Sequence, residues 1–309
     1  MPLVPPPPLL LLAAAAVVSG AAAELQQGSP AAAWVQPRFL LSMWYDPVVP
    51  ASEFPARYRE IRDANMTVVM GGFGARNASM VQAQLAAAEP LGLGVVAAAT
   101  AGISGYGGSK ALWGYQLKDE PHQQEFEGLA GWTRTIGAAH PHKLRFINLL
   151  PNCPLATCLN ASSYPEYVSR YVSVVKPDVL CMDAYPNFAA ANLTTAADAY
   201  LFVLAVLRAN ALESSLNFWN FFGTQHVFGD SPDPSEAQIR WQAFTSLAMG
   251  AKGLLYYCWH GGLEFPGGVL APRAPLAAFK QWRPGDELAL TDHYDHVKRE
   301  SQRCARFGS

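Results

Sequence analysis

The stretch LWGYQLKDEP, residues 112–121, contains the pattern that decides the fold. Its apolar and aromatic run has the composition of a buried strand and ends abruptly in Asp119, Glu120 and Pro121. Proline suits the first position of a helix and holds the residue before it extended, so a helix is expected to follow. The two carboxylates at the end of this strand are the first candidates for chemistry.

The same pattern recurs along the chain, where apolar runs alternate with segments of helical periodicity. The eight expected strands cover residues 39–45, 67–73, 94–99, 112–118, 144–149, 179–182, 216–222 and 253–259. The expected helices cover residues 54–64, 79–89, 123–139, 164–175, 195–210, 236–250 and 292–303. The short Gly-rich gap at 100–111 predicts that one helix is reduced or missing.

Alternation of strands and helices predicts parallel strands joined by right-handed crossovers. Eight strands in a chain of 309 residues, half of them hydrophobic, are typical of a single (β/α)8 TIM barrel of the α/β class. An open, doubly wound sheet is the alternative, but it usually carries a Gly-rich turn after its first strand. Residues 44–47 read WYDP, without glycine, so we favour one barrel domain over residues 24–309.

The N-terminus has the features of a secretory signal peptide, residues 1–23. An apolar run from Leu9 to Val18 is followed by small residues, and cleavage after Ala23 fits the usual rule. Ten apolar residues are too few to span a membrane, and the later apolar run from Leu201 to Leu207 is also short. We therefore expect a secreted or lumenal protein without a transmembrane segment.

Glycosylation sequons and cysteines agree with secretion. The N-x-S/T sequons are at Asn65, Asn77, Asn160 and Asn192, which predicts a glycoprotein. Cys153 and Cys158 lie in a Pro-containing loop and could form a local disulfide. Cys181 and Cys258 lie within expected strands and are interpreted as buried thiols.

Charge and motifs exclude several function classes. The formal net charge is −2 with 15% charged residues, which gives no indication of a nucleic-acid or anionic-membrane partner. The cysteines show no paired C-x-x-C spacing, and G-x-S-x-G and H-E-x-x-H stretches are missing. We expect neither a metal site nor an organic cofactor.

In a TIM barrel the chemistry takes place at the carboxyl ends of the strands, so those ends supply the candidate residues. They are Tyr45, Asp46, Glu120, Asp183, Tyr185, Trp219, Gln225, Tyr257, Trp259 and His260. Carboxylates that converge with Trp and Tyr on a concave site point to sugar chemistry. Aromatic faces pack against the C–H surfaces of sugar rings, and amide or His groups hold hydroxyls.

Side-chain alternation separates the two carboxylates of the fourth strand. It places Asp119 on the apolar, outward face, where the side chain could cap the next helix. It places Glu120 on the inward face together with Lys118. The same rule turns Asp183 of the sixth strand inward.

Five blocks of sequence occur in the order of a known family. They are GYQLKDEP (114–121), INLLPN (147–152), YPEYVSRYVSVVKPDVLCMDAYP (164–186), FWNFFG (218–223) and RWQAFTSLAMGAKGLLYYCWH (240–260). Together they resemble the poorly characterised glycoside-hydrolase-like barrels related to the β-galactosidase group of the large retaining clan. The resemblance implies that Glu120, at the end of strand four, is the general acid/base. It also implies that relatives continue beyond Ser309, which leaves open a truncation at the C-terminus.

One departure from the family pattern concerns its nucleophile, a Glu at the end of strand seven. No carboxylate lies between Leu216 and Phe228, and Gln225 occupies that region. Asp183 could instead activate water in an inverting reaction, which needs widely spaced carboxyls. Glu264 and Asp46 are weaker candidates. Lys118 raises a further question. A cation next to Glu120 would lower the pKa of this carboxyl, whereas a general acid needs a raised pKa.

The sequence therefore predicts a secreted hydrolase of O-glycosidic bonds in a carbohydrate substrate. Glu120 is the expected acid, and Asp183 the expected base or stabilising anion. A non-catalytic carbohydrate-binding protein on the same barrel is the alternative, motivated by the missing strand-seven Glu. A barrel hydrolase of another class, such as an amidase or phosphodiesterase, ranks last because its usual motifs are missing.

Overall fold

The computed structural model of the protein describes residues 34–44, 46–47, 49–71, 77–152, 156–188, 193–225, 233–259, 270–272 and 288–307. Residues Ala31–Ser309 form one compact unit, and the account below concerns this unit alone. The expected signal peptide lies outside the described residues.

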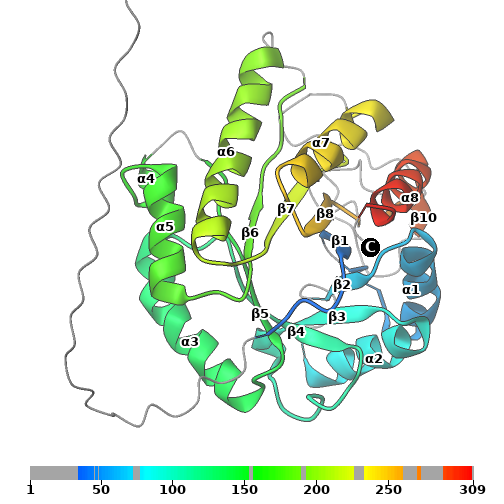
Figure 1. Cartoon of the computed structure of the whole chain (residues 1–309). Helices are drawn as coiled ribbons and strands as arrows, with labels where there is room; N and C mark the ends of the chain where they lie inside the picture. The colour runs from blue at the N-terminus through cyan, green and yellow to red at the C-terminus, as the bar shows by residue number, and fades with distance from the viewer. Residues whose placement is uncertain are drawn as a thin grey trace, which may run out of the picture. The chain divides into compact units, whose positions relative to one another are not determined.

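Eight parallel strands form the centre of this unit (Figure 1). They are β1 (Leu40–Trp44), β2 (Val68–Gly71), β3 (Gly94–Ala98), β4 (Leu112–Asp119), β5 (Leu144–Asn148), β6 (Leu180–Asp183), β7 (Phe218–Gly223) and β8 (Gly253–Tyr257). They pair in two four-stranded sheets, in the orders β1-β8-β7-β6 and β2-β3-β4-β5. Each strand falls on the segment that the apolar runs predict.

A few hydrogen bonds connect the two sheets at both seams. Between β1 and β2 the amide of Thr67 donates to the carbonyl of Leu41 at 2.8 Å. Between β5 and β6 the amide of Leu149 donates to the carbonyl of Cys181 at 2.9 Å. The strands therefore follow one another in cyclic order, although the ladder is interrupted at these seams. The α/β barrel predicted from the alternation is confirmed.

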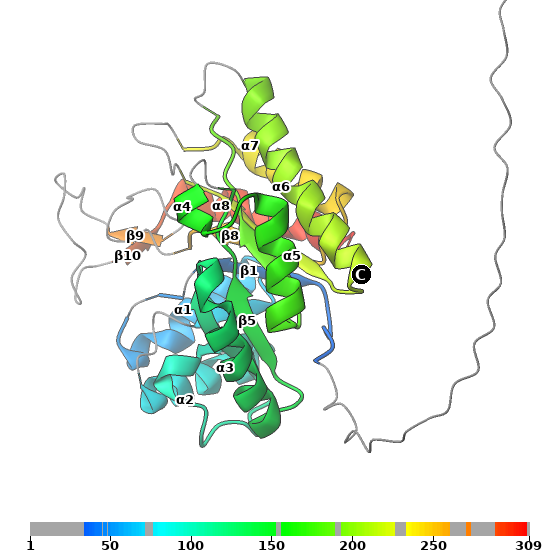
Figure 2. The same ribbon diagram turned by 90° about the vertical axis from the view of Figure 1, so that its left-hand side faces the viewer.

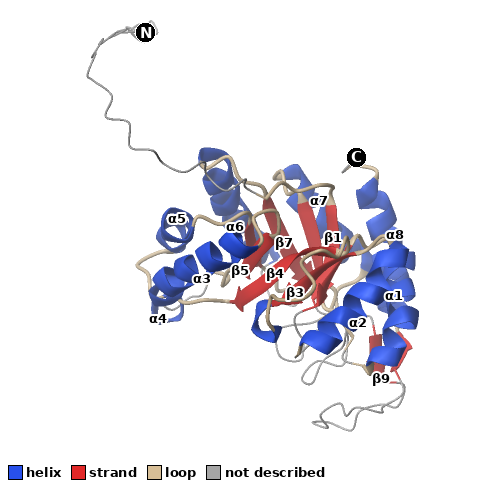
Figure 3. Cartoon of the chain, turned by 90° about the horizontal axis from the view of Figure 1, so that it is seen from below, coloured by secondary structure: helices blue, strands red, loops and turns tan. Residues whose placement is uncertain are grey.

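Helices surround the strands, as the view from below shows (Figure 3). They are α1 (Phe54–Asp63), α2 (Ala78–Ala88), α3 (Phe126–Ala139), α4 (Ala156–Leu159), α5 (Tyr164–Val175), α6 (Leu193–Glu213), α7 (Glu236–Ala248) and α8 (Asp292–Ala305). Short 3-10 turns are η1 (Ala51–Glu53), η2 (Glu89–Leu91), η3 (Ala99–Ala101) and η4 (Gln123–Glu125). Only η3 lies in the gap between β3 and β4, which confirms the predicted loss of a helix there. A small antiparallel pair, β9 (Leu270–Pro272) and β10 (Leu288–Leu290), was not predicted (Figure 2).

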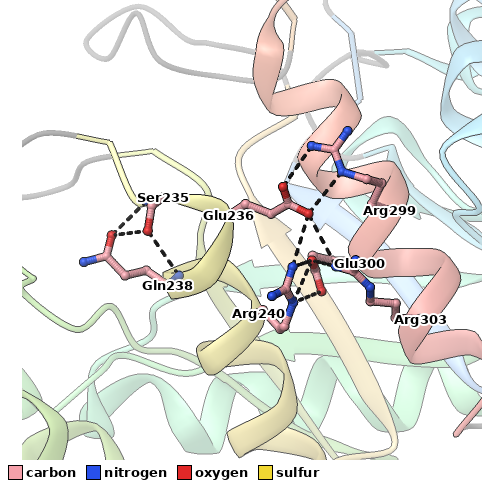
Figure 4. Close-up of polar contacts among 7 residues, drawn as sticks. All are labelled: Ser235, Glu236, Gln238, Arg240, Arg299, Glu300 and Arg303. Atoms are coloured by element: carbon pink, nitrogen blue, oxygen red, sulfur yellow. Dashed lines mark hydrogen bonds and ion pairs between the residues drawn. The ribbon is translucent and has the colours of Figure 1, made fainter.

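Side-chain caps explain where several helices begin. The Oδ1 atom of Asn77 accepts a hydrogen bond from the amide of Met80 at 3.0 Å and starts α2. Ser235 and Gln238 form a reciprocal capping box at the start of α7 (Figure 4). Such caps satisfy amides that have no partner within the helix.

Aromatic side chains fill the barrel interior near the amino ends of the strands. Trp219 stacks on Phe146 with a centroid distance of 5.8 Å, and Trp34 packs edge-on against Trp219 at 6.0 Å. A Cβ atom at Gly253 would lie 2.5 Å from the Trp219 ring, so glycine is required beside this bulky residue. This layer closes one end of the barrel and leaves the opposite end for the site.

Helix α6 is long and apolar enough to cross a membrane, judged by length and composition only. Here it is an outer helix of the barrel, and it packs against α5 and β7 through Tyr200, Val203, Leu204 and Leu207. The same test is passed by core helices of soluble proteins. The expectation that the chain lacks a transmembrane segment stays a prediction.

Charged groups attach the last helix, α8, to α7 (Figure 4). The Glu300 side chain is fully buried, and its carboxylate pairs with the guanidinium groups of Arg240, at 2.9 Å, and Arg303. Glu236 pairs with Arg299 at 2.9 Å, which lowers the pKa of Glu236 to about 2. The network joins residues that lie about sixty positions apart in the chain.

Candidate active site

Two irregularities in β4 decide which side chains reach the barrel interior. The register of β4 shifts against β3 at Val95/Val96, and against β5 between Gln116 and Lys118. A β-bulge inserts one residue and reverses the alternation beyond it. The strict alternation assumed for this strand is therefore wrong at its carboxyl end.

The bulge exchanges the expected positions of Lys118 and Asp119. Lys118 pairs with Glu125 of η4 at 3.0 Å, on the outside of the barrel. Asp119 instead faces inward, where its Oδ1 atom accepts a hydrogen bond from Nδ2 of Asn148 at 3.2 Å. Asp119 is therefore not a helix cap, and Lys118 is not the inward cation that would disfavour a protonated Glu120.

The backbone of Glu120 leaves the strand in the left-handed region, with φ of 48°. The extended conformation expected from Pro121 is wrong at this residue, and a non-glycine residue adopts this region only when the surroundings hold it there. The amide of Glu120 donates to the carbonyl of Asn148 at 2.8 Å. The hydroxyl of Tyr167 donates to the carbonyl of Pro121 at 2.6 Å and fixes the turn that follows.

Three carboxyl groups at the carboxyl ends of β4 and β6, those of Asp119, Glu120 and Asp183, line one cavity. Nδ2 of Asn148, at the end of β5, donates to Oδ1 of Asp183 at 2.9 Å as well as to Asp119. Asp183 is only 7% exposed, whereas Glu120 is accessible to solvent. One accessible carboxyl therefore shares the cavity wall with a buried one.

Burial raises the pKa of all three carboxyls. Burial, followed by the charge of Glu120, raises the pKa of Asp119 to about 7. The same two causes, in the same order, raise the pKa of Asp183 well above its ordinary value. Burial also raises the pKa of Glu120, against the opposing effects of Asp183 and of the charge of His122. Carboxyls that interact in this way titrate together.

The carboxyls line a cavity of about 670 Å³. Trp44 and Phe221, in edge-on contact at 5.5 Å, form one aromatic part of its wall. Tyr185 and Tyr257, with centroids 5.2 Å apart, form another. A cavity of this size that combines aromatic walls with a few polar groups is typical of a small-molecule or sugar-unit site.

Several residues expected in the site lie elsewhere. Trp219 is fully buried in the lower layer of the barrel, and its Nε1 donates to Oε1 of Gln36 at 3.0 Å. Trp259 is also fully buried, and it packs against Tyr294 of α8 at 5.9 Å. Neither side chain lines the cavity, because the position of each residue along its strand buries it in the core. Both assignments to substrate binding are corrected to core packing.

Two polar candidates are buried away from the cavity. Asp46 is fully buried and accepts a hydrogen bond from Nε2 of Gln84 on α2. Gln225 is 1% exposed and is not among the residues that line the cavity. Both are therefore removed from the expected substrate-binding set. Tyr45, His260 and the weaker candidate Glu264 lie outside the described residues.

The sequence reasoning identified Glu120, Asp183, Tyr185 and Tyr257 among the residues of the cavity wall and missed the others. Asp119 was interpreted as a cap, and Asn148, Trp44 and Phe221 were not considered as site residues. Asn148 ends β5 at the level where Asp119 ends β4, so inspection of every strand end for polar residues could have found it. Across the described part of the chain, no group of three or more His, Cys, Asp or Glu side chains is arranged to hold a metal ion.

No protein-family model matches the sequence, and comparison with curated proteins gives no match. Solved structures do match. The endo-1,4-β-D-mannanase of Thermotoga petrophila is 12% identical with a TM-score of 0.58, and the match covers 86% of this chain and 99% of the mannanase. A family 42 β-galactosidase of G. stearothermophilus is 11% identical with a TM-score of 0.61, and the match covers 90% of this chain and 58% of that one.

A third similar structure is a glucosidase of Croceicoccus marinus, 11% identical with a TM-score of 0.55 over 90% of this chain and 68% of the other. These proteins are (β/α)8-barrel glycosidases, and identities this low show the fold alone. The resemblance to the β-galactosidase group is thus confirmed at the level of the barrel. What the barrel does has to be argued from its own site.

Proposed function

We propose that the protein is a glycoside hydrolase that uses Glu120 as its general acid. The observation that carries this proposal is the accessible Glu120 carboxyl, which lines an aromatic-walled cavity together with buried Asp183. A general acid must hold its proton near the working pH, and the raised pKa of Glu120 has that direction. The proton would go to the glycosidic oxygen of the leaving group.

The role proposed for Asp183 is that of base or stabilising anion. It lines the cavity together with Glu120, and Nδ2 of Asn148 donates to its Oδ1 at 2.9 Å. Retaining glycosidases separate their two carboxyls by about 5–5.5 Å, and inverting ones by about 6.5–9.5 Å, because substrate or water lies between them. The inverting reaction expected from the sequence stays a prediction.

The cavity walls support a carbohydrate as the substrate. The Tyr185–Tyr257 pair and the Trp44–Phe221 pair present ring faces and edges that can pack against the C–H surface of a sugar. Asn152 and Asn187 line the same cavity and carry amides that can bind hydroxyls. The site needs no group beyond side chains for proton transfer.

Entry into the secretory pathway is part of the proposal. It is supported by the apolar N-terminal run with small residues before position 24 and by the sequons. Cys158 is disulfide-bonded, as suits an oxidising compartment, and its expected partner Cys153 lies outside the described residues. Asn160 is exposed and offers an accessible site for a glycan.

The experiment is turnover of a panel of unactivated α- and β-glycosides, alkyl glycosides and disaccharides, by the purified protein and by its Glu120→Gln variant. Cleavage of at least one glycoside, with a loss of about 100-fold or more in the variant, is expected for general acid catalysis. Cleavage that the variant retains in full would remove Glu120 from this role. If neither protein cleaves any glycoside, hydrolysis is refuted, and glycan binding by both proteins would support the binding-protein alternative.

A further inference from the structure

The wall of the cavity changes in character between the strand ends and helix α6. At the strand ends it carries the carboxyls of Asp119, Glu120 and Asp183 and the amide of Asn148. Helix α6 contributes Ala196, Ala199, Tyr200 and Val203. The cavity, of about 670 Å³, is in the size range of sites for drug-sized ligands, which are larger than one sugar ring. Room therefore remains for the group to which the sugar is linked.

The polar part of the wall suits the sugar. Asn148 is 4% exposed, and its Nδ2 donates to Asp119 and to Asp183. Its Oδ1 is buried and has no hydrogen-bond partner among the described residues. A buried acceptor without a partner costs free energy, which a hydroxyl of a bound ligand would recover. This part of the wall therefore fits the sugar ring, with its glycosidic oxygen at Glu120.

The described α6 part of the wall offers no free polar side chain. The hydroxyl of Tyr200 accepts a hydrogen bond from Nδ2 of Asn220 at 2.8 Å, and it donates to the carbonyl of Gln242 at 3.2 Å. It also contacts Oγ of Ser246 at 3.0 Å. The other α6 residues that line the cavity are two alanines and a valine. These side chains can bury apolar groups, but they cannot replace the water that a sugar hydroxyl would lose.

Two kinds of leaving group differ in what they would gain at α6. A second sugar would bring hydroxyls against hydrocarbon side chains, which is unfavourable when the hydroxyls find no partner. A hydrocarbon gains from the same contacts, since each buried CH2 group strengthens binding about fourfold. We propose that the substrate is a glycoside of an apolar alcohol, whose hydrocarbon chain packs against Ala196, Ala199 and Val203 of α6. The inference rests on the proposed function and adds the class of the aglycone.

An exposed aromatic cluster continues this apolar surface. The ring of Tyr200 packs on that of Trp241 of α7 at a centroid distance of 5.4 Å, and Phe188 lies edge-on to Trp241 at 6.1 Å. Trp241 is a large apolar side chain, yet 36% of it is exposed. A chain that leaves the cavity past Tyr200 would cover these rings. This arrangement favours an aglycone with a long chain, such as an alkyl group or the hydrocarbon of a lipid.

The test uses methyl, butyl and octyl glycosides of the sugar that the panel above identifies, together with a disaccharide of that sugar. These alkyl alcohols need similar help from Glu120, so the comparison reports the contacts of the aglycone. Burial of three further CH2 groups should raise kcat/KM for the octyl glycoside by about 60-fold over that for the methyl glycoside. Equal values for the methyl and octyl glycosides, or faster cleavage of the disaccharide, would overturn this inference and keep the proposed function.

A pair of matched variants locates the contact. Ala199 lines the cavity, whereas Ala205 is exposed on the same helix and is not among the lining residues. Ala199→Gln places a polar amide beside the chain and should lower the octyl-to-methyl ratio of kcat/KM by about 10-fold or more. Ala205→Gln should keep the ratio of the wild type. An unchanged ratio in Ala199→Gln would contradict packing of the chain on α6.

A second readout needs no turnover. The octyl 1-thioglycoside of the cleaved sugar, or octyl 1-thio-β-D-glucoside if none is cleaved, is added below its critical micelle concentration. It should raise the Tm of the wild type more than the methyl analogue does, and Ala199→Gln should lose this difference. Such binding without cleavage of any glycoside would refute the proposed function and keep the apolar site. Equal Tm values together with no cleavage would overturn both.

Discussion

Glu120 and Asp183 line the same cavity, although the two residues are 63 positions apart in the sequence. The fold thus brings an accessible group at the end of β4 and a buried group at the end of β6 to one site. Burial raises the pKa of both carboxyls, and the charge of Glu120 adds to this effect at Asp183. A carboxyl that keeps its proton to a higher pH is what general acid catalysis requires.

The first prediction concerns the pH dependence of activity. The pair loses its activating proton as pH rises, so the alkaline limb of the kcat/KM profile reports its upper pKa. Asp183→Asn removes the charge that opposes the second ionisation, and the alkaline limb should move to lower pH by about one unit or more. Lys118→Ala is the matched control, because Lys118 pairs with Glu125 outside the barrel and should leave the limb in place.

The second prediction concerns the stability cost of Asp119. Its pKa rises from 3.8 to about 7 on folding, so its favourable contribution is complete below about pH 4 and is lost as pH rises through 7. As the pH rises from about 4 to about 7, ionisation of buried Asp119 should lower the free energy of unfolding by a few kcal/mol at most. Each unit of pKa shift corresponds to about 1.4 kcal/mol. Asp119→Asn removes this loss, and urea unfolding at pH 4 and pH 8 measures the difference. A variant with the same pH dependence as the wild type would contradict the shift.

The third prediction concerns glycosylation. Asn160 is exposed, whereas the side-chain amide of Asn65 donates to the carbonyl of Ser301 on α8 at 3.2 Å. A glycan on Asn65 would break this contact and displace α8. In protein made through a secretory pathway, intact-mass measurement should show that Asn160→Gln removes one glycan and Asn65→Gln removes none. A glycan on Asn65 would show that α8 does not pack there as described.

The fourth prediction concerns the attachment of α8. Glu300 is buried and joins two arginines, so Glu300→Gln leaves Arg240 and Arg303 only their longer pairs with Glu236, at 3.3 and 3.4 Å, and should lower Tm clearly. Glu236→Gln is the control, because its pairs are more exposed and more screened, and the drop in Tm should be smaller. Equal drops would mean that burial of Glu300 does not matter. The comparison is made by thermal unfolding at one pH and one salt concentration.

The barrel could be predicted from the sequence because its cause is local. The apolar runs and helical periodicities each extend over ten or more residues, and caps such as Ser235 mark the helix starts. The lost helix before β4 was also predictable, since a Gly-rich stretch of twelve residues cannot hold one. The β9–β10 pair escaped because strands of three residues carry no periodicity.

The site was only partly predictable because it depends on details that alternation does not contain. The bulge after Gln116 turned Asp119 inward and Lys118 outward, and such a register shift leaves no mark in the local sequence. Trp219 and Trp259 are residue types that are common in sugar sites. Trp219 packs on Phe146 and Trp259 packs on Tyr294, and these contacts place both side chains in the core. Glu120 and Asp183 could be identified because each ends a strand with strong apolar character.

The fifth prediction, and the most direct measurement, is the dependence of the Glu120→Gln loss on the leaving group. The proton from Glu120 matters most when the departing alcohol is a poor leaving group and least when it is a stable phenolate. Glu120→Gln should therefore lower kcat/KM by about 100-fold or more on an unactivated alkyl or disaccharide glycoside, and by much less on the 2,4-dinitrophenyl glycoside of the same sugar. An equal loss on both substrates, or no loss on either, would contradict a general-acid role for Glu120.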